Sequence, residues 1–505
     1  MFMEFIELAD YPLRAGRVTE WLPTADAHWA EWPRDWRAVS YNHERHLRDA
    51  LDHHRVRVGR QCWLGHVLRV EGPLDAAAWR TALEAWVDRH EVLRSHVAIE
   101  GGRPARYTLP PGAAQVRPVD AGRPASAMSA YRLVHRLLDE RTSPLDWPAH
   151  LCVTIDHRES FTAVVAADHS VMDGYSTTSI GGELRALYDA ARAGNHPALP
   201  PAASYLDFCH LERRRADSAT ADHPAVALWR EFLTAAANYE PTPGDFAGAA
   251  TYPVAPTPAD STAHATPQRA RAAETAVRHA APQHTLAVEV LDAAAADRAA
   301  AAAREHGQGL VAVLLAAFAA AHTEPGNAGE FRTVVPMHTR DEPRWADSLG
   351  WYVGLAPYRI DCDARGLADL VAPSGTELRR SRTAATVPFP RVCELLDVRP
   401  RISSMVSYMD IRGALGADRW LASDTRWLRS RTRSADEFFC WFLRTPAGVT
   451  LNMRCPGTAR ATRDVHRQVL RVRHLLDGYA RHGDAPLRAG APTSRTLGQG
   501  APTWR

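Results

Sequence analysis

The chain has 505 residues, 46% of them hydrophobic and 23% charged, which is typical of a globular protein with room for roughly two to four domains. Its 60 basic and 58 acidic residues leave a net charge of +2, which argues against a protein held on nucleic acid by a bulk electrostatic field. The sequence contains no lysine, so a lysine Schiff base, a Walker-A lysine and a kinase-type lysine are all excluded.

Cysteine usage and the apolar segments predict a cytoplasmic protein. The seven cysteines are scattered and form no C-x-x-C pair, which fits reduced thiols better than a disulfide framework or a zinc knuckle. The N-terminal apolar stretch contains Glu4, Glu7 and Asp10 and lacks a basic start, so we expect no signal peptide. The longest apolar run, 310–322, is too short to span a bilayer, and any contact with a membrane is therefore expected to be peripheral.

The first half of the chain alternates segments of strand and helix character. Residues 161–167 (FTAVVAA) form a continuous apolar run that indicates a buried strand, and Asp75 precedes an apolar repeat of helical spacing in the position of an N-cap. The predicted strands are residues 62–70, 94–99, 151–155 and 161–167, and the predicted helices are residues 41–56, a segment that starts after Asp75, 128–140 and 175–193.

In the second half, an Ala-, Pro- and Thr-rich segment at 239–284 predicts a linker or long surface loop. After it, the predicted strands are residues 285–290, 331–336, 405–409 and 449–453, and the predicted helices are 292–305, 310–322 and 463–479. This pattern predicts two α/β lobes, residues 1–200 and 201–480. A mobile tail is expected at 481–505.

One segment combines residue types that carry chemistry: DHSVMDG at 168–174, between a predicted strand and a predicted helix. The end of a strand is where open α/β sheets bind ligands, and a histidine with a pKa near 6.5 can act as a general base. Asp173 can brace the loop by pairing with an arginine, and Gly174 permits a tight bend into the helix. The alternative is a turn histidine that only bonds to the backbone. The position between strand and helix favours a functional role.

The segment resembles the H-H-x-x-x-D-G motif of the condensation-domain and acyl-CoA-dependent acyltransferase superfamily. Residues 75–97 resemble the early helix and R-H-E-x-L-R entry of that superfamily, and 349–357 resemble its G-W-F-x-N-x-x-P segment. The segments GRVTEW, SYNHERHLR and YLDFC, together with the terminal TWR, are more specifically similar to polyketide-associated acyltransferases that acylate trehalose. The resemblance covers nearly the whole chain.

The resemblance implies two chloramphenicol-acetyltransferase-like lobes in a V-shaped arrangement, with the active site in a tunnel between them. It implies an acyltransferase that moves an acyl or polyketidyl group from a thioester to a hydroxyl acceptor, such as the sugar trehalose. The donor would be acyl-CoA or a phosphopantetheine thioester on an acyl carrier protein. No metal or permanently bound cofactor is implied, and we expect a monomer.

The same resemblance implies roles for individual residues. His169 would be the general base, and Asp173 would be structural, paired with Arg340 by its position after a predicted strand. The backbone N–H of Gly174 would lie near the developing oxyanion. A donor of this kind stabilises a transition state by roughly 3–4 kcal/mol. Ser407 or Tyr408 would bond to substrate, although a simple core strand explains them equally well.

Asp168 departs from the family pattern, because most condensation domains have histidine there. Together with Asp173 and Ser176 it also fits the D-x-x-x-x-D-x-x-S motif of heterocyclisation domains. A freestanding condensation enzyme that forms an amide and a catalytically silent recruitment module are further alternatives.

Two other patterns favour ordinary surface roles. His43, His46 and His53 lie at near-helical spacing and could form a metal site, but a polar helix face is the preferred interpretation. The arginine runs 213–215 and 426–433 are typical of solvated faces, and one of them could dock an acidic carrier protein.

Overall fold

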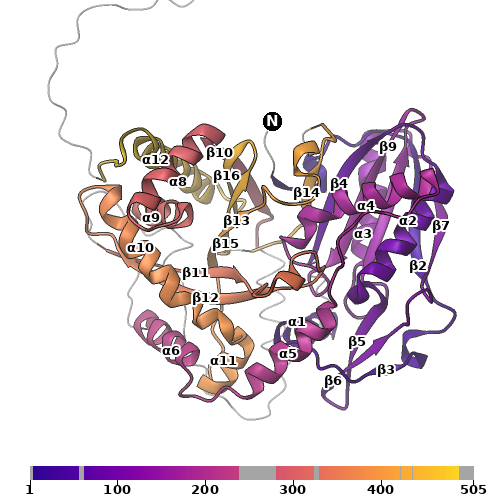
Figure 1. The fold of residues 1–505 in the computed structure, drawn as a ribbon, viewed down its shortest axis with the longest axis horizontal. Coiled ribbons are helices and arrows are strands. Elements are labelled where there is room, and N and C mark those ends of the chain that lie inside the picture. Colours follow the sequence, from indigo (N-terminus) through magenta and orange to yellow (C-terminus); the bar gives the residue numbers. More distant parts are fainter. Residues whose placement is uncertain are drawn as a thin grey trace, which may run out of the picture.

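The computed structural model describes residues 4–55, 62–237, 280–322, 329–420, 422–434 and 436–487. Two mixed α/β lobes lie side by side (Figure 1). The first is mostly indigo to magenta and the second mostly red to yellow, and the magenta helix α6 (Pro224–Ala237) lies with the second lobe. Most of the segment predicted as a linker and most of the predicted tail, with the terminal TWR, lie outside the described residues. The strand β10 already begins at Gln283, inside the predicted linker.

A seven-stranded sheet forms the first lobe. In spatial order its strands are β1 (Phe5–Glu7), β14 (Arg426–Arg429), β4 (Trp63–Glu71), β9 (Ser160–Asp168), β8 (His150–Asp156), β2 (Arg17–Thr24) and β7 (Gln115–Gly122). Only β1 and β14 run parallel, and β14 is supplied by the second half of the chain. The rule for ligands at the ends of parallel strands therefore does not explain where the motif lies.

Helices cover both faces of this sheet. Alternate residues of β9 point to opposite sides, so Val165 packs with α2 (Ala76–Arg89) and α4 (Ser176–Ala193), whereas Val164 packs with α3 (Ala127–Arg141). Burial on both faces explains why the sequence of β9 is apolar without alternation. A three-stranded sheet, β3 (Arg34–Asp35), β6 (Arg103–Thr108) and β5 (Ser95–Glu100), lies beside α1 (Tyr41–Arg55) and α5 (Tyr205–Asp217) (Figure 1).

The second lobe is built on a six-stranded sheet. Its strands, in spatial order, are β10 (Gln283–Asp292), β16 (Gly448–Pro456), β15 (Phe438–Thr445), β13 (Ser404–Asp410), β11 (Glu330–His338) and β12 (Val353–Asp361). One face packs on α8 (Ala293–Glu305), α9 (Leu310–His322), α10 (Leu367–Arg382) and α12 (Ala459–His482). The other face packs on α6 (Pro224–Ala237) and α11 (Phe389–Leu396).

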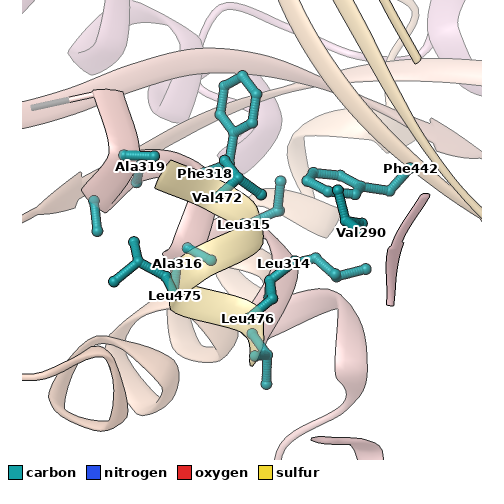
Figure 2. Close-up of a cluster of buried hydrophobic side chains, with 14 of the residues drawn as sticks. Val290, Leu314, Leu315, Ala316, Phe318, Ala319, Phe442, Val472, Leu475 and Leu476 are labelled. Atoms are coloured by element: carbon teal, nitrogen blue, oxygen red, sulfur yellow. The ribbon is translucent and has the colours of Figure 1, made fainter. Parts of the chain in front are cut away.

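Figure 2 shows the main core of this lobe, where Leu314, Leu315 and Phe318 of α9 meet Val472 and Leu476 of α12. The 13 residues of α9 are mostly alanine, leucine and valine and are almost entirely buried. This helix is apolar on all sides because it is enclosed by the sheet and by its neighbours. None of the helices in the described ranges is long and apolar enough to cross a membrane.

The main predicted elements are confirmed. The helix after Asp75 is capped by its carboxylate, which accepts hydrogen bonds from the backbone N–H groups of Ala77 and Ala78. The helix that ends at Ala193 is terminated by Gly194 in the left-handed conformation. The interpretation of residues 426–433 as a solvated face was wrong at its first half, because β14 is buried within the first sheet.

Candidate active site

The motif begins where β9 ends. The backbone N–H of Asp168 donates to the carbonyl of Ala149 at 2.8 Å, and that of His169 donates to the carbonyl of Cys62 at 2.9 Å. The strand is therefore held from both sides up to the histidine, and the chain then turns into α4. This anchoring fixes the backbone that carries the imidazole.

The His169 side chain is partly buried, and its ring packs against the indole of Trp351 with centroids 4.4 Å apart. Burial lowers the pKa of His169 below its usual 6.5, and a hydrogen bond to its own backbone partly opposes this shift. The imidazole is therefore neutral at pH 7. Among the described residues, no other group bonds to either ring nitrogen, and Nδ1 is the buried one. A proton on Nδ1, next to the backbone, leaves the lone pair of Nε2 available to accept a proton.

Asp168 is 1% exposed and pairs with His46 of α1. Nε2 of His46 lies 2.9 Å and 3.1 Å from the two carboxylate oxygens, and the backbone N–H of Ser170 donates to Oδ1 at 2.8 Å. Burial alone would raise the pKa of Asp168, but His46 and the Ser170 N–H hold it below its usual value. Asp168 is therefore an ionised carboxylate whose hydrogen bonds shape the turn that carries His169.

Asp173 and Arg340 come together, as their positions in the sequence suggested. Nη2 of Arg340 lies 3.4 Å from Oδ1 of Asp173, which also accepts from the backbone N–H of Ser176 at 2.7 Å. Oδ2 of Asp173 accepts from the backbone N–H of Tyr352 at 3.0 Å. The Arg340 guanidinium lies over the Tyr352 ring at 4.1 Å. Asp173 thus joins the turn before α4 to the segment between β11 and β12.

The G-W-Y segment at 350–352 lies against the motif. The backbone N–H of Asp173 donates to the carbonyl of Gly350 at 3.0 Å, and the Ser176 hydroxyl donates to the same carbonyl at 3.0 Å. A Cβ on Gly350 would come within 2.4 Å of the Tyr205 ring, so this position needs glycine for the close approach.

Gly174 lies at the contact between the lobes. A Cβ built on it would lie 3.6 Å from Met409 and 3.7 Å from Phe5, which are ordinary contacts, and its φ is not in the left-handed region. The bend into the helix at Gly174 therefore does not draw on the conformational freedom of glycine. Gly174 itself is partly exposed.

Ser407 and Tyr408 lie on opposite faces of β13. Val406 and Tyr408 pack with the helix layer of the second lobe, so Ser407 faces the other side with Met409, whose side chain approaches Gly174. Burial raises the pKa of Tyr408 to about 12. Of the two, Ser407 lies on the face that looks toward the motif.

Sequence reasoning missed His46, because the stripe of histidines on α1 was interpreted as a polar face. In the structure His43 is buried and His46 bonds to the motif. The described residues hold no group of three or more His, Cys, Asp or Glu side chains arranged to bind a metal ion. The only sequence feature related to His46 is the unusual aspartate at 168, with which it pairs in the structure. No local pattern in the sequence reveals that pairing.

Comparisons with known proteins agree with this architecture. A family model described as the condensation domain matches residues 57–414. Acyltransferase PapA3 of Mycobacterium tuberculosis is 23% identical over 497 residues, covering 94% of this chain and 96% of that protein. The AMB antimetabolite synthetase AmbE of Pseudomonas aeruginosa is 32% identical over 186 residues, which is 35% of this chain and 8% of that protein.

Among solved structures, the PapA2 acyl transferase superposes with a TM-score of 0.79 at 21% identity, covering 94% of this chain and 99% of that one. The first condensation domain of the calcium-dependent antibiotic synthetase superposes with a TM-score of 0.62 at 17% identity, covering 90% and 98%. These likenesses show the two-lobed condensation-domain fold. With more than two thirds of its length matched by the family model, the chain belongs to the condensation-domain family.

Proposed function

We propose that the protein is an acyltransferase that moves an acyl or polyketidyl group from a thioester to a hydroxyl acceptor, with His169 as the general base. The acceptor would be a sugar such as trehalose, and the donor an acyl-CoA or an acyl carrier protein. Similarity to PapA3 and PapA2, both named as acyltransferases, extends over 94% of the chain and supports this assignment.

The observation that carries the proposal is the state of His169. Its imidazole is neutral at pH 7, is held by its backbone and by Trp351, and keeps Nε2 without a partner among the described residues. Nε2 would take the proton of the acceptor hydroxyl as the oxygen attacks the thioester carbonyl. The tetrahedral intermediate would then expel the thiolate, which receives that proton. The backbone N–H of Gly174 would stabilise the oxyanion.

The contacts of the two aspartates argue against heterocyclisation. In that mechanism the carboxylates of Asp168 and Asp173 would face the substrate, but both are buried and bonded to groups of the protein. The amide-forming alternative differs from the proposal only in its acceptor, which is an amine instead of a hydroxyl. The recruitment alternative differs only in that no thioester is turned over. Both can therefore be separated from the proposal by one assay.

The assay offers a panel of acyl-CoA and acyl-carrier-protein donors to the purified full chain, with trehalose or a matched amino sugar as acceptor, and detects products by mass. We expect ester formation, with His169→Ala reducing turnover at least a hundredfold. His54→Ala, on the exposed side of α1, is the matched control and should retain wild-type turnover. Wild-type rates in His169→Ala would disprove the role of the histidine, and exclusive amide formation would favour the condensation alternative.

A further inference from the structure

A concave site lies in the first lobe, on the side of β8 away from β9. It is a cavity of about 400 Å³, a size suited to a small ligand. Three tryptophans contribute to its wall, and we call it the indole cavity. It is lined by Leu22–His28, Trp29, Trp32, Glu140, Arg141, Ser143, Asp146, Trp147 and Pro148.

The cavity opens where two neighbouring strands separate. The last pair between β2 and β8 is Trp21 with Cys152, and residues 22–24 continue along β7 alone. The cavity residues Trp147 and Pro148 lead into Ala149, whose carbonyl accepts the N–H of Asp168. The indole cavity therefore lies at the same end of the sheet as His169, about 10 Å away by strand spacing.

Its aromatic walls are fixed in orientation. The indole N–H of Trp29 donates to Oδ1 of Asp146 at 2.9 Å, that of Trp32 to the carbonyl of Ala27 at 3.0 Å, and that of Trp147 to the carbonyl of Leu93 at 2.8 Å. Trp32 and Trp147 also pack edge to face at 4.9 Å. Trp29 and Trp147 are partly exposed and Trp32 is buried, so with every indole N–H already bonded the first two rings offer a ligand apolar surface rather than hydrogen bonds.

The polar groups that line the cavity are of mixed type. Asp26, Glu140 and Asp146 supply carboxylates, which disfavour binding of an anionic ligand. His28 and Arg141 supply hydrogen-bond donors, which a simple cation cannot use. Arg141 bonds through Nε to Glu20 at 2.7 Å and still has 45% of its side chain exposed. A neutral ligand with several hydroxyl groups and an apolar face matches all of these groups.

We propose that the indole cavity binds a saccharide, with a sugar ring against the indoles and its hydroxyls bonded to Asp26, Glu140 and Arg141. This site is separate from His169 and its occupation needs no acyl transfer. It would retain a sugar beside the active site, at the end of the sheet where the proposed acceptor reacts.

The test is calorimetric titration of the full chain with trehalose, with methyl α-D-glucopyranoside and, as the competing cation, with choline. We expect saturable binding of the sugars and at least tenfold weaker binding by Asp26→Ala/Glu140→Ala. Ala27→Phe, which places a ring over the cavity, should also weaken binding. Glu159→Ala, in the turn at the opposite end of β8, is the matched control and should bind as wild type does.

His169→Ala should bind sugar at this site with unchanged affinity, which separates the proposal from the proposed catalytic function. Saturation-transfer NMR of the bound sugar, with and without Ala27→Phe, checks that the signal comes from the indole cavity. The proposal is overturned if wild type binds neither sugar, if both cavity variants bind as tightly as wild type, or if choline binds in preference to sugar.

Discussion

Asp168 and Asp173 flank His169 in sequence but have different partners in space. Asp168 bonds to His46 of α1, and Asp173 bonds to Arg340 and to the backbone of Tyr352. Since both carboxylates are occupied, the imidazole is the residue of the motif that is free to accept a proton. At this scale, the contacts of the two aspartates are with groups of the protein, which agrees with the proposal that His169 is the general base.

Gly174→Ala tests whether the space beside this backbone N–H belongs to a substrate. The added methyl would make only ordinary contacts with Met409 and Phe5, so we expect the free energy of unfolding to change by less than about 1 kcal/mol. We expect kcat/KM for acyl transfer to fall at least tenfold, because the methyl occupies the approach to the oxyanion donor. Thermal unfolding and the transfer assay measure the two effects. Unchanged turnover would place the substrate elsewhere.

His46→Ala tests the pair between α1 and the motif. The change leaves the buried Asp168 carboxylate without the imidazole that bonds to it, so the pKa of Asp168 should rise and the protein should lose about 1–3 kcal/mol of stability. Turnover should fall as the turn that holds His169 loosens. His46→Gln keeps a donor near Asp168 and should recover part of both losses. If the alanine variant matched wild type in urea unfolding and in turnover, the pair would have no supporting role.

At the scale of elements, sequence patterns predicted those features of helices and strands that depend on residues nearby in the sequence. The cap at Asp75 and the apolar run of β9 each depend on neighbours in sequence, and both were predicted. The strand β14 was not predicted, because Arg426 and Arg429 resemble a solvated run. Their carboxylate partners include Glu4 and Glu7, which are far away in the sequence.

The candidate site likewise combines residues that a local sequence pattern indicates with residues that only long-range packing brings to it. The spacing of the motif and its resemblance to a family pointed to His169, Asp173 and Arg340, and the structure pairs Asp173 with Arg340. His46 could not be identified, because its contact with Asp168 depends on how α1 packs over the end of the sheet. Trp351, which packs on the His169 ring, was noted only as part of a resembling segment.

Asp173→Ala tests the connection between the turn before α4 and the segment that precedes β12. Asp173 is 1% exposed and the Arg340 side chain 7%, so the variant leaves a buried guanidinium without its carboxylate, although it still donates to the Ser176 hydroxyl and the Ser348 carbonyl. The protein should lose about 3 kcal/mol of stability. Asp173→Ala/Arg340→Met removes that charge as well and should recover part of the loss. Denaturant unfolding measures both variants. An Asp173→Ala protein as stable as wild type would contradict a structural role.

At the scale of the molecule, the two lobes share strands and contacts. The second half of the chain contributes β14 to the first sheet, next to β1, and the backbone N–H of Phe5 in β1 donates to Asn452 of the second sheet at 3.1 Å. The expected boundary near residue 200 therefore does not separate the two sheets completely, because β14 from the second half of the chain lies in the first sheet. Because His169 and Gly174 lie at this junction, the relative position of the lobes is part of the site.

Buried histidines make the stability of the whole molecule depend on pH. Burial lowers the pKa of His43 and of His150 to about 3, and that of His66 and of His96 to about 4, from the usual 6.5. Below pH 6.5 the unfolded chain therefore binds protons that the native protein does not. The free energy of unfolding should fall as the pH decreases from about 7 toward 4, with a slope that approaches about 1.4 kcal/mol per pH unit for each such histidine between about pH 6 and 5.

His150→Gln isolates one of these contributions, because burial is the cause of its shift and its side chain is 3% exposed in β8. The variant cannot take up that proton when it unfolds, so the slope of stability against pH between 6 and 5 should be lower by about one proton. Urea unfolding at a series of pH values measures this slope. His54→Ala, at an exposed position, should leave the slope as in wild type. An unchanged slope in His150→Gln would mean that the native protein already protonates His150, and that its surroundings stabilise the charge.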